Sequence, residues 1–205
     1  MGSFARLAFT PAVQAVQETM GSKKVYDRVR QDGRDDVLGE DERSFLAERD
    51  SFYLASISET GWPYVQHRGG PKGFVQVLDE RTIAFADLRG NKQYISVGNV
   101  AGNDRVALIF VDYPNRARLK VLARVEIITE QDDPQTMARL VVDGQKGVAE
   151  RGFLLHIEGF DWNCPRHITP RYTEDEIRER LTPLMNELEA LRAENARLRA
   201  AAVKT

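Results

Sequence analysis

The sequence predicts an α+β protein dominated by β-structure, in which a mostly antiparallel β-barrel carries peripheral helices and a C-terminal helix. The main observation is a series of short segments that are rich in β-branched or aromatic residues and separated by turn clusters. These expected strands cover residues 52–58, 63–67, 74–78, 82–86, 106–111, 119–129 and 152–160. They follow one another with little room for crossover connections, which favours antiparallel pairing and a barrel.

Helix signals precede the strands. Thr10 is a capping residue and Pro11 follows it at the first helical position, so a helix is expected over residues 12–20. A second helix is expected over residues 40–49, where apolar residues suit a core face.

Two more helices are expected between strands, over residues 92–100 and 134–142. The chain therefore divides into three expected parts. Residues 1–50 form a helical segment packed on the barrel, residues 51–172 form the barrel domain, and residues 173–205 form the C-terminal helix.

The C-terminal segment has the heptad pattern of a short leucine zipper. Its seam residues step by three and four along the chain: Leu181, Leu184, Leu188, Leu191, Asn195, Leu198 and Ala202. A single Asn at an a position favours two parallel strands in register. The segment contains Pro183, which must lie near a helix start or make a kink.

Charged residues flank this seam. Glu187 and Arg192, and likewise Glu194 and Arg199, are spaced to attract each other across a parallel dimer. The alternative is an amphipathic helix that packs on its own domain. We favour pairing between subunits, because the apolar stripe is the narrow seam of a coiled coil and not the wider face of a globular helix.

Composition sets limits on the function. The chain has 205 residues, 42% of them hydrophobic, which is enough for a real core. Its 29 Lys and Arg against 31 Asp and Glu leave a net charge of -2, so no global field draws it to nucleic acid or an anionic membrane. Any anion site must therefore be local.

The single cysteine excludes an intramolecular disulfide framework and a cysteine-rich zinc site. The three histidines, His67, His156 and His167, lack metal-ligand spacing, so no metal site is expected. The N-terminus has no apolar core of the signal-peptide kind, and no run approaches the ~18 apolar residues of a membrane span. We expect a soluble, cytoplasmic protein.

Two glycine-punctuated basic segments suggest a local anion site. They are RGGPKGF at residues 68–74 and RGNKQY at residues 89–94. Glycines allow a ligand to approach the backbone closely, and Arg, Lys and amide groups supply donors that suit a phosphate. The second segment is expected to open a helix, whose N-terminal N–H groups would also favour a phosphate. The alternative is a pair of ordinary turns with solvated basic residues.

Together with WNCPRHITPR at residues 162–171, these segments resemble the pyridoxamine 5'-phosphate oxidase-like family of split-barrel FMN-binding proteins. The resemblance spans about residues 10 to 172. It implies a split antiparallel barrel of the FMN-binding type, FMN as the cofactor, and a homodimer with its sites at the subunit interface. A small molecule would be the substrate.

The resemblance also implies which residues bind FMN. By position, the residues expected to bind the phosphate are Arg89, Asn91 and Lys92. Those expected to bind the flavin ring or the ribityl chain are Gln66, His67 and Arg68. Further expected contacts come from Lys72, Gln93, Arg116, Arg118 and Trp162, of which Trp162 would cover the ring from the partner subunit. Alternatively, Trp162 belongs to a small satellite core and Arg118 to a surface cross-strand pair.

The implied activity is an FMN-dependent oxidoreductase. A cation beside the pyrimidine end of the flavin, either Arg68 or Arg118, would favour the reduced state. No catalytic residue is assigned, and Cys164 is a poor nucleophile candidate because its immediate neighbours offer no general base apart from His167.

One departure from the family's founding enzyme argues against genuine pyridoxamine-phosphate oxidation. That enzyme ends in a substrate-binding strand, whereas this chain runs through Pro170 and Thr173 into the charged zipper segment. Two other functions remain open. One is a non-catalytic protein that binds or senses flavin or haem, and the other is an assembly module whose zipper recruits a partner.

Overall fold

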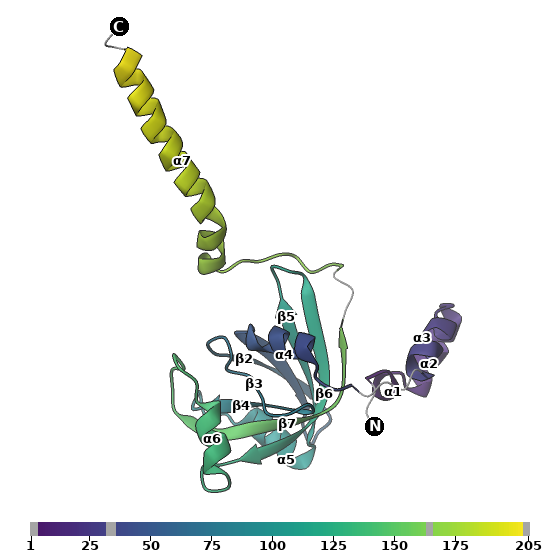
Figure 1. The fold of residues 1–205 in the computed structure, drawn as a ribbon. Coiled ribbons are helices and arrows are strands. Elements are labelled where there is room, and N and C mark those ends of the chain that lie inside the picture. The colour runs from purple at the N-terminus through teal and green to yellow at the C-terminus, as the bar shows by residue number, and fades with distance from the viewer. Residues whose placement is uncertain (1–3, 32–35, 163–165, 203–205) are drawn as a thin grey trace. The chain divides into compact units, whose positions relative to one another are not determined.

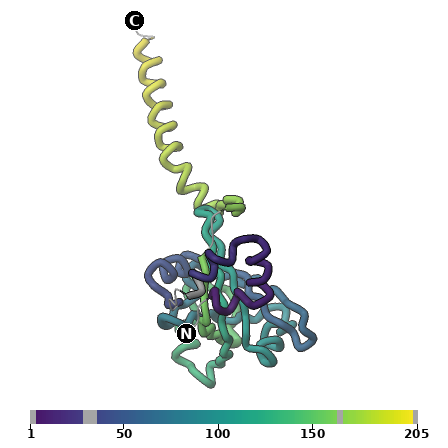
Figure 2. The backbone as a smooth tube through the Cα atoms, turned by 90° about the vertical axis from the view of Figure 1, so that its right-hand side faces the viewer, coloured from purple at the N-terminus to yellow at the C-terminus, as the bar shows by residue number. Residues whose placement is uncertain are grey.

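The computed structural model describes residues 4–31, 36–162 and 166–202. The chain divides into two compact units. The first comprises Met1–Asp112 and Ala117–Arg166, and the second comprises Tyr113–Arg116 and His167–Thr205. Figure 1 shows the strands of the first unit and the long helix α7 of the second, and Figure 2 traces the same chain as a tube.

The first unit is built on one seven-stranded sheet in which every neighbouring pair is antiparallel. The strand order is β2-β1-β5-β6-β7-β4-β3, so β2 and β3 are the edges and the sheet is not closed by pairing between them. The fold predicted from the sequence, a mostly antiparallel split barrel with helices around it, is confirmed. The strands are β1 (Ser51–Ile57), β2 (Pro63–Gly69), β3 (Gln76–Val77), β4 (Thr82–Leu88), β5 (Arg105–Asp112), β6 (Ala117–Ile128) and β7 (Ala149–Trp162).

The expected strand over residues 74–78 is mostly wrong, because only Gln76 and Val77 pair there. Phe74 is instead buried in the core and stacks on Phe52 with ring centroids 5.7 Å apart. A Cβ at Gly70 would lie only 2.7 Å from the Phe74 side chain. Packing against Phe74 therefore accounts for the glycine at position 70 without any ligand.

An aromatic cluster forms the centre of the core. Phe52 of β1 is 1% exposed, and its ring contacts those of Phe74, Phe85 and Phe110 at centroid distances of 4.8 to 5.7 Å. Phe85 in turn stacks on Phe153 of β7 at 5.2 Å. These contacts join β1, β4, β5 and β7, so one cluster holds both halves of the sheet together.

Three helices form where the sequence predicts them: α2 (Pro11–Thr19), α4 (Glu40–Ala47) and α6 (Pro134–Leu140). Thr10 and Asp133 cap α2 and α6, since their side chains accept hydrogen bonds from the backbone N–H groups of Val13 (3.4 Å) and Thr136 (2.9 Å).

Two short helices were not expected: α1 (Phe4–Ala8) and α3 (Lys23–Gln31). Helix α1 is held to β7 by Asp36, whose Oδ2 accepts hydrogen bonds from the backbone N–H groups of Phe4 (2.6 Å) and Phe160 (3.2 Å). Burial raises the pKa of Asp36.

Helix α5 (Ile95–Gly102) begins later than the expected 92–100. The residues before it cannot be helical, because Lys92 and Tyr94 adopt left-handed backbone conformations with φ of 60° and 52°. Residues 90–94 therefore form a loop between β4 and α5.

Helix α7 (Glu174–Ala202) lies in the second unit and contains Pro183. At its base, the Arg171 guanidinium lies over the Tyr113 ring at 4.9 Å and that of Arg180 lies over Tyr172 at 4.4 Å. Among the helices that the structure describes, none has the length and apolar character needed to cross a membrane.

Replacing Phe52 by Ala is expected to lower the free energy of unfolding by about 3–5 kcal/mol, because it opens a cavity at the centre of the cluster. Phe52→Leu is expected to cost clearly less, since most of the volume is retained. Urea denaturation of both variants measures the difference. Equal, small losses would show that this cluster does not organise the core.

Candidate functional site

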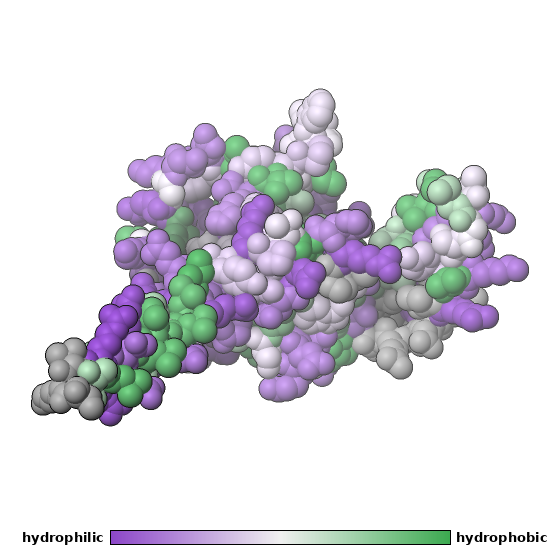
Figure 3. All heavy atoms as spheres, turned by 90° about the horizontal axis from the view of Figure 1, so that it is seen from above, coloured by the Kyte–Doolittle hydropathy of each residue, from purple (hydrophilic) through white to green (hydrophobic). Residues whose placement is uncertain are grey.

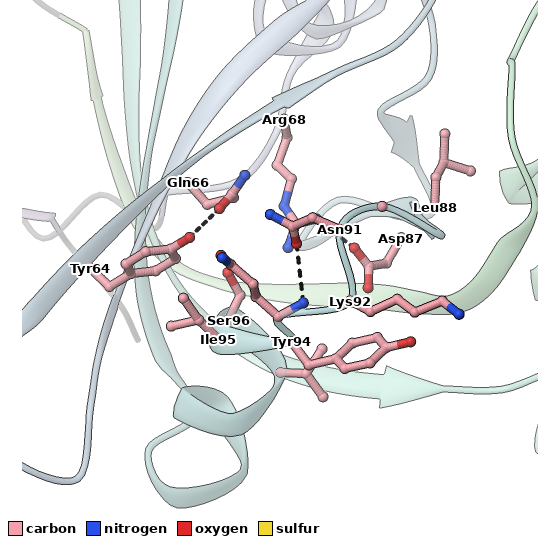
Figure 4. Close-up of a pocket in the computed structure, with 13 residues that line it drawn as sticks. Tyr64, Gln66, Arg68, Asp87, Leu88, Asn91, Lys92, Tyr94, Ile95 and Ser96 are labelled. Atoms are coloured by element: carbon pink, nitrogen blue, oxygen red, sulfur yellow. Dashed lines mark hydrogen bonds and ion pairs between the residues drawn. The ribbon is translucent and has the colours of Figure 1, made fainter.

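A polar pocket lies where the edge strand β2 meets the end of β4 and the loop that leads into α5 (Figure 4). Three side chains of β2 line it: Tyr64, Gln66 and Arg68. The other walls come from Asp87 and Leu88 of β4 and from residues 90–97.

The alternation of strand β2 decides which of its side chains face the pocket. Tyr64, Gln66 and Arg68 are half-buried, whereas His67 is exposed on the opposite face and packs edge-on against Tyr53 at 5.4 Å. The Tyr64 hydroxyl donates a hydrogen bond to Gln66 Oε1. This bond fixes the Gln66 carboxamide, as Figure 4 shows.

The loop after β4 presents both a cation and free backbone donors. Asn91 Oδ1 accepts a hydrogen bond from the backbone N–H of Gln93 (3.1 Å), which stabilises the turn. The N-cap residue of α5, Tyr94, makes no side-chain capping bond. No side-chain cap therefore occupies the first N–H groups of α5, and Ile95 and Ser96 at this positive end of the helix line the pocket.

A chain of ion pairs runs beneath the pocket. Asp87, 6% exposed, accepts hydrogen bonds from Arg68 Nη1 through one carboxylate oxygen and from Arg151 Nη1 (3.0 Å) through the other. Arg151 also binds Glu150 (3.0 Å), which accepts a hydrogen bond from Arg89 Nε (2.8 Å). The three arginines outnumber the two carboxylates, so the network carries a net positive charge.

The outer end of this network stays charged at neutral pH. The hydrogen bond from Arg89 holds the pKa of Glu150 below its usual value, and the same bond raises the pKa of Arg89. The charge of Arg89 is therefore compensated. Lys92 is exposed and has no ion-pair partner within the described part of the chain, so its charge is available to a ligand.

Arg68 has an unused donor. Its guanidinium lies over the rings of Phe85 (5.6 Å) and Phe153 (5.4 Å), and Asp87 binds Nη1. Arg68 Nε is buried and has no hydrogen-bond partner among the residues that the structure describes. A buried N–H without an acceptor is energetically costly.

The structure brings part of the predicted site together. Five predicted residues line the pocket: Gln66, Arg68, Asn91, Lys92 and Gln93. Eight other lining residues were not among the predicted site residues, and four of these have polar side chains, namely Tyr64, Asp87, Tyr94 and Ser96. Side chains two residues apart in a strand lie on the same face, so the position of Gln66 already indicates that Tyr64 faces the same side.

The other predicted residues lie outside this pocket. His67 faces the other side of β2, Lys72 pairs with Glu48 (2.9 Å), and Arg89 pairs with Glu150. Arg118 lies on β6 opposite Val111, and Arg116 belongs to the second unit. Their roles in cofactor binding stay predictions.

Trp162 also lies outside the pocket. It packs edge-on against Phe45 of α4 at 4.7 Å and donates a hydrogen bond to Glu42 Oε1 (2.8 Å). Trp162 is 38% exposed, and its predicted place over the flavin ring stays a prediction. Cys164 lies outside the described residues. The described residues contain no cluster of three or more His, Cys, Asp or Glu that could hold a metal ion.

Comparisons with known proteins agree with the fold. The HupZ protein of Group A Streptococcus is 15% identical, with a TM-score of 0.51 over 66% of this chain and 99% of that chain. A Clostridium acetobutylicum protein related to general stress protein 26, of the pyridoxinephosphate oxidase family, is 17% identical, with a TM-score of 0.44 over 67% and 94%. An FMN-binding protein from Syntrophomonas wolfei is 12% identical, with a TM-score of 0.47 over 60% and 83%.

No curated protein matches the chain significantly. A family model, pyridoxamine 5'-phosphate oxidase, matches residues 38–155. This match covers more than half of the chain and includes the strands and the loop that form the pocket. The protein therefore belongs to the pyridoxamine 5'-phosphate oxidase family.

Proposed function

We propose that the protein binds FMN in this pocket and is an FMN-dependent oxidoreductase that acts on a small-molecule substrate. The observation that carries the proposal is the pocket itself, because the Arg68 guanidinium, held by Asp87, and the charge of Lys92, which has no ion-pair partner in the described part of the chain, line the same cavity. Membership in the pyridoxamine 5'-phosphate oxidase family supports a flavin as the ligand.

The phosphate would be held at the loop end of the pocket. Lys92 supplies an uncompensated positive charge, and the uncapped start of α5 supplies N–H groups. Asn91 keeps the loop in shape through its bond to Gln93. Arg89 would contribute less, because Glu150 already binds it.

The ribityl and ring would lie along β2. Gln66, fixed by Tyr64, offers polar atoms to hydroxyl or ring groups, and Arg68 offers Nε. Bound FMN supplies hydride or electron acceptance. Arg68 would stabilise negative charge on the ring, and Asp87 holds the guanidinium in place for this role.

Genuine pyridoxamine-phosphate oxidation is not proposed. The founding enzyme ends in a substrate-binding strand, and here the regular structure after β7 in the described part of the chain is the helix α7. We infer a related oxidation or reduction.

Lys92→Ala is expected to weaken FMN binding by about 10- to 150-fold, because a hydrogen bond to a charged group contributes roughly 1.5–3 kcal/mol. Riboflavin, which lacks the phosphate, should bind both proteins equally. Adding Arg89→Ala should increase the loss only slightly. Fluorescence titration with both ligands measures these affinities.

Lys24→Ala is the matched control, because it removes the same charge from the exposed helix α3, away from the pocket lining. It should leave both affinities unchanged. Equal losses of FMN and riboflavin affinity in Lys92→Ala would remove Lys92 from the phosphate site.

We also propose that the barrel is a homodimer and that the partner subunit completes the FMN site. The pocket holds about 210 Å³, less than the roughly 300–1,000 Å³ of typical ligand pockets. The outer face of β1 and β2 also exposes apolar side chains, namely Tyr53, Ile57 and Val65. An uncovered apolar patch of this kind suits contact with a second copy.

A fragment that ends at Tyr172 is expected to remain a dimer and to bind FMN as the full chain does, because α7 is not part of the pocket. Sedimentation with detection at the flavin absorbance measures mass and cofactor together, and the full chain is the control. A flavin-loaded monomer would contradict the interface site.

A further inference from the structure

Helix α7 carries an apolar stripe that the second unit leaves uncovered. None of its residues is buried. Leu184 and Leu198, nearly four turns apart, are 61% and 62% exposed. Hydrophobic side chains gather along one side of this helix in Figure 3.

The stripe has the geometry of a coiled-coil seam. The a positions are 181, 188, 195 and 202 and the d positions are 184, 191 and 198. A shallow groove follows this seam on the helix surface and is lined by Leu188, Leu191, Arg192, Asn195, Ala196 and Arg199. Ile177 continues the d positions toward the start of the helix.

Charge selects the orientation of a second helix. Glu187 and Glu194 occupy g positions, while Arg192 and Arg199 occupy e positions. In a parallel pair each g glutamate meets an e' arginine, whereas in an antiparallel pair glutamates would face glutamates and arginines would face arginines. These four side chains make no ion pair with one another in the described part of the chain, so they are available to a partner.

Asn195 sets the number of strands and the register. A polar Asn at one a position costs stability but pairs with its symmetry mate in a two-stranded coil. Pro183 falls at a c position, outside the seam, so it does not block contact. Asn195 therefore favours a copy of the same helix over a foreign apolar surface.

The heptad segment of α7 is short, so its pairing requires that the two helices be held close together. Residues 181–202 extend about 33 Å at 1.5 Å per residue, or about three heptads. A coil of this length is marginal in isolation. Two such helices held on the barrel dimer proposed above have an effective concentration in the mM range, which favours their association, so the pairing rests on that proposed dimer.

We propose that α7 pairs with α7 of a second copy of this chain as a parallel, in-register, two-stranded coiled coil. The pairing uses no residue of the pocket and does not depend on flavin. It gives the protein a second contact between subunits, separate from the barrel.

Cysteine crosslinking of the full chain tests the proposal. In a Cys164→Ala background, Leu184→Cys and Asn195→Cys each place a thiol on the seam, while Ala193→Cys places one at an f position that faces away. Disulfides require Cα atoms about 4.4–6.8 Å apart. Mild oxidation should therefore link the first two variants into covalent dimers and leave the third mostly unlinked.

The two seam positions also report direction. In an antiparallel pair, the two copies of position 184 would lie near opposite ends of the coil and would not crosslink. Failure of both seam variants to crosslink, or equal crosslinking of Ala193→Cys, would overturn the proposal. Flavin absorbance, recorded on the same samples, keeps this result separate from the fate of the FMN site.

Asn195→Leu provides a second measurement that needs no oxidation. It should raise the melting temperature of the helical circular dichroism signal from α7 and allow species larger than a dimer. An unchanged melting profile would show that Asn195 does not lie in a buried seam.

Discussion

The site depends on one interaction, the pairing of the buried Asp87 carboxylate with two arginines. It binds Arg68 of β2 and Arg151 of β7, while Asp87 itself lies on β4. β2 is one edge of the sheet and β4 lies next to the other edge, so the pair between Arg68 and Asp87 connects two strands that no backbone hydrogen bond joins, whereas Arg151 lies opposite Asp87 on the neighbouring strand. Removing one partner of such a buried pair typically costs roughly 3–5 kcal/mol, because it leaves the other charge uncompensated.

This constraint gives the pocket its chemistry. Asp87 binds only Nη1 of Arg68 and leaves Nε without a partner in the described structure. The cation is thus held in place before any ligand arrives, which reduces the cost of ordering it on binding. At the other end of the network, Glu150 compensates Arg89, so Lys92 carries the free charge at the mouth.

The strands were predictable from the sequence because their period of two and their β-branched residues are local signals. Expected segments 106–111 and 119–129 became β5 and β6 with small changes at the ends. The strand expected over residues 74–78 is mostly wrong because Phe74 packs in the core, so its apolar side chain does not indicate a strand. The start of α5 was placed too early because the left-handed conformation of Lys92 has no clear sequence signal.

The site was predictable only in part. Basic glycine-containing segments identified Arg68, Asn91 and Lys92, since phosphate chemistry needs such residues close together in sequence. The ion pair between Asp87 and Arg151 spans 64 residues, so only the fold could reveal it. His67 lies on the opposite face of β2 from Gln66 and Arg68, because successive side chains of a strand alternate between its two faces.

The visible absorption spectrum of the purified full-length protein, together with the mass of any released cofactor, shows most directly whether the pocket holds FMN. We expect a yellow protein, or a colourless one that turns yellow with added FMN, and a released molecule with the mass of FMN. A haem spectrum, or a protein that stays colourless after incubation with FMN, would contradict it.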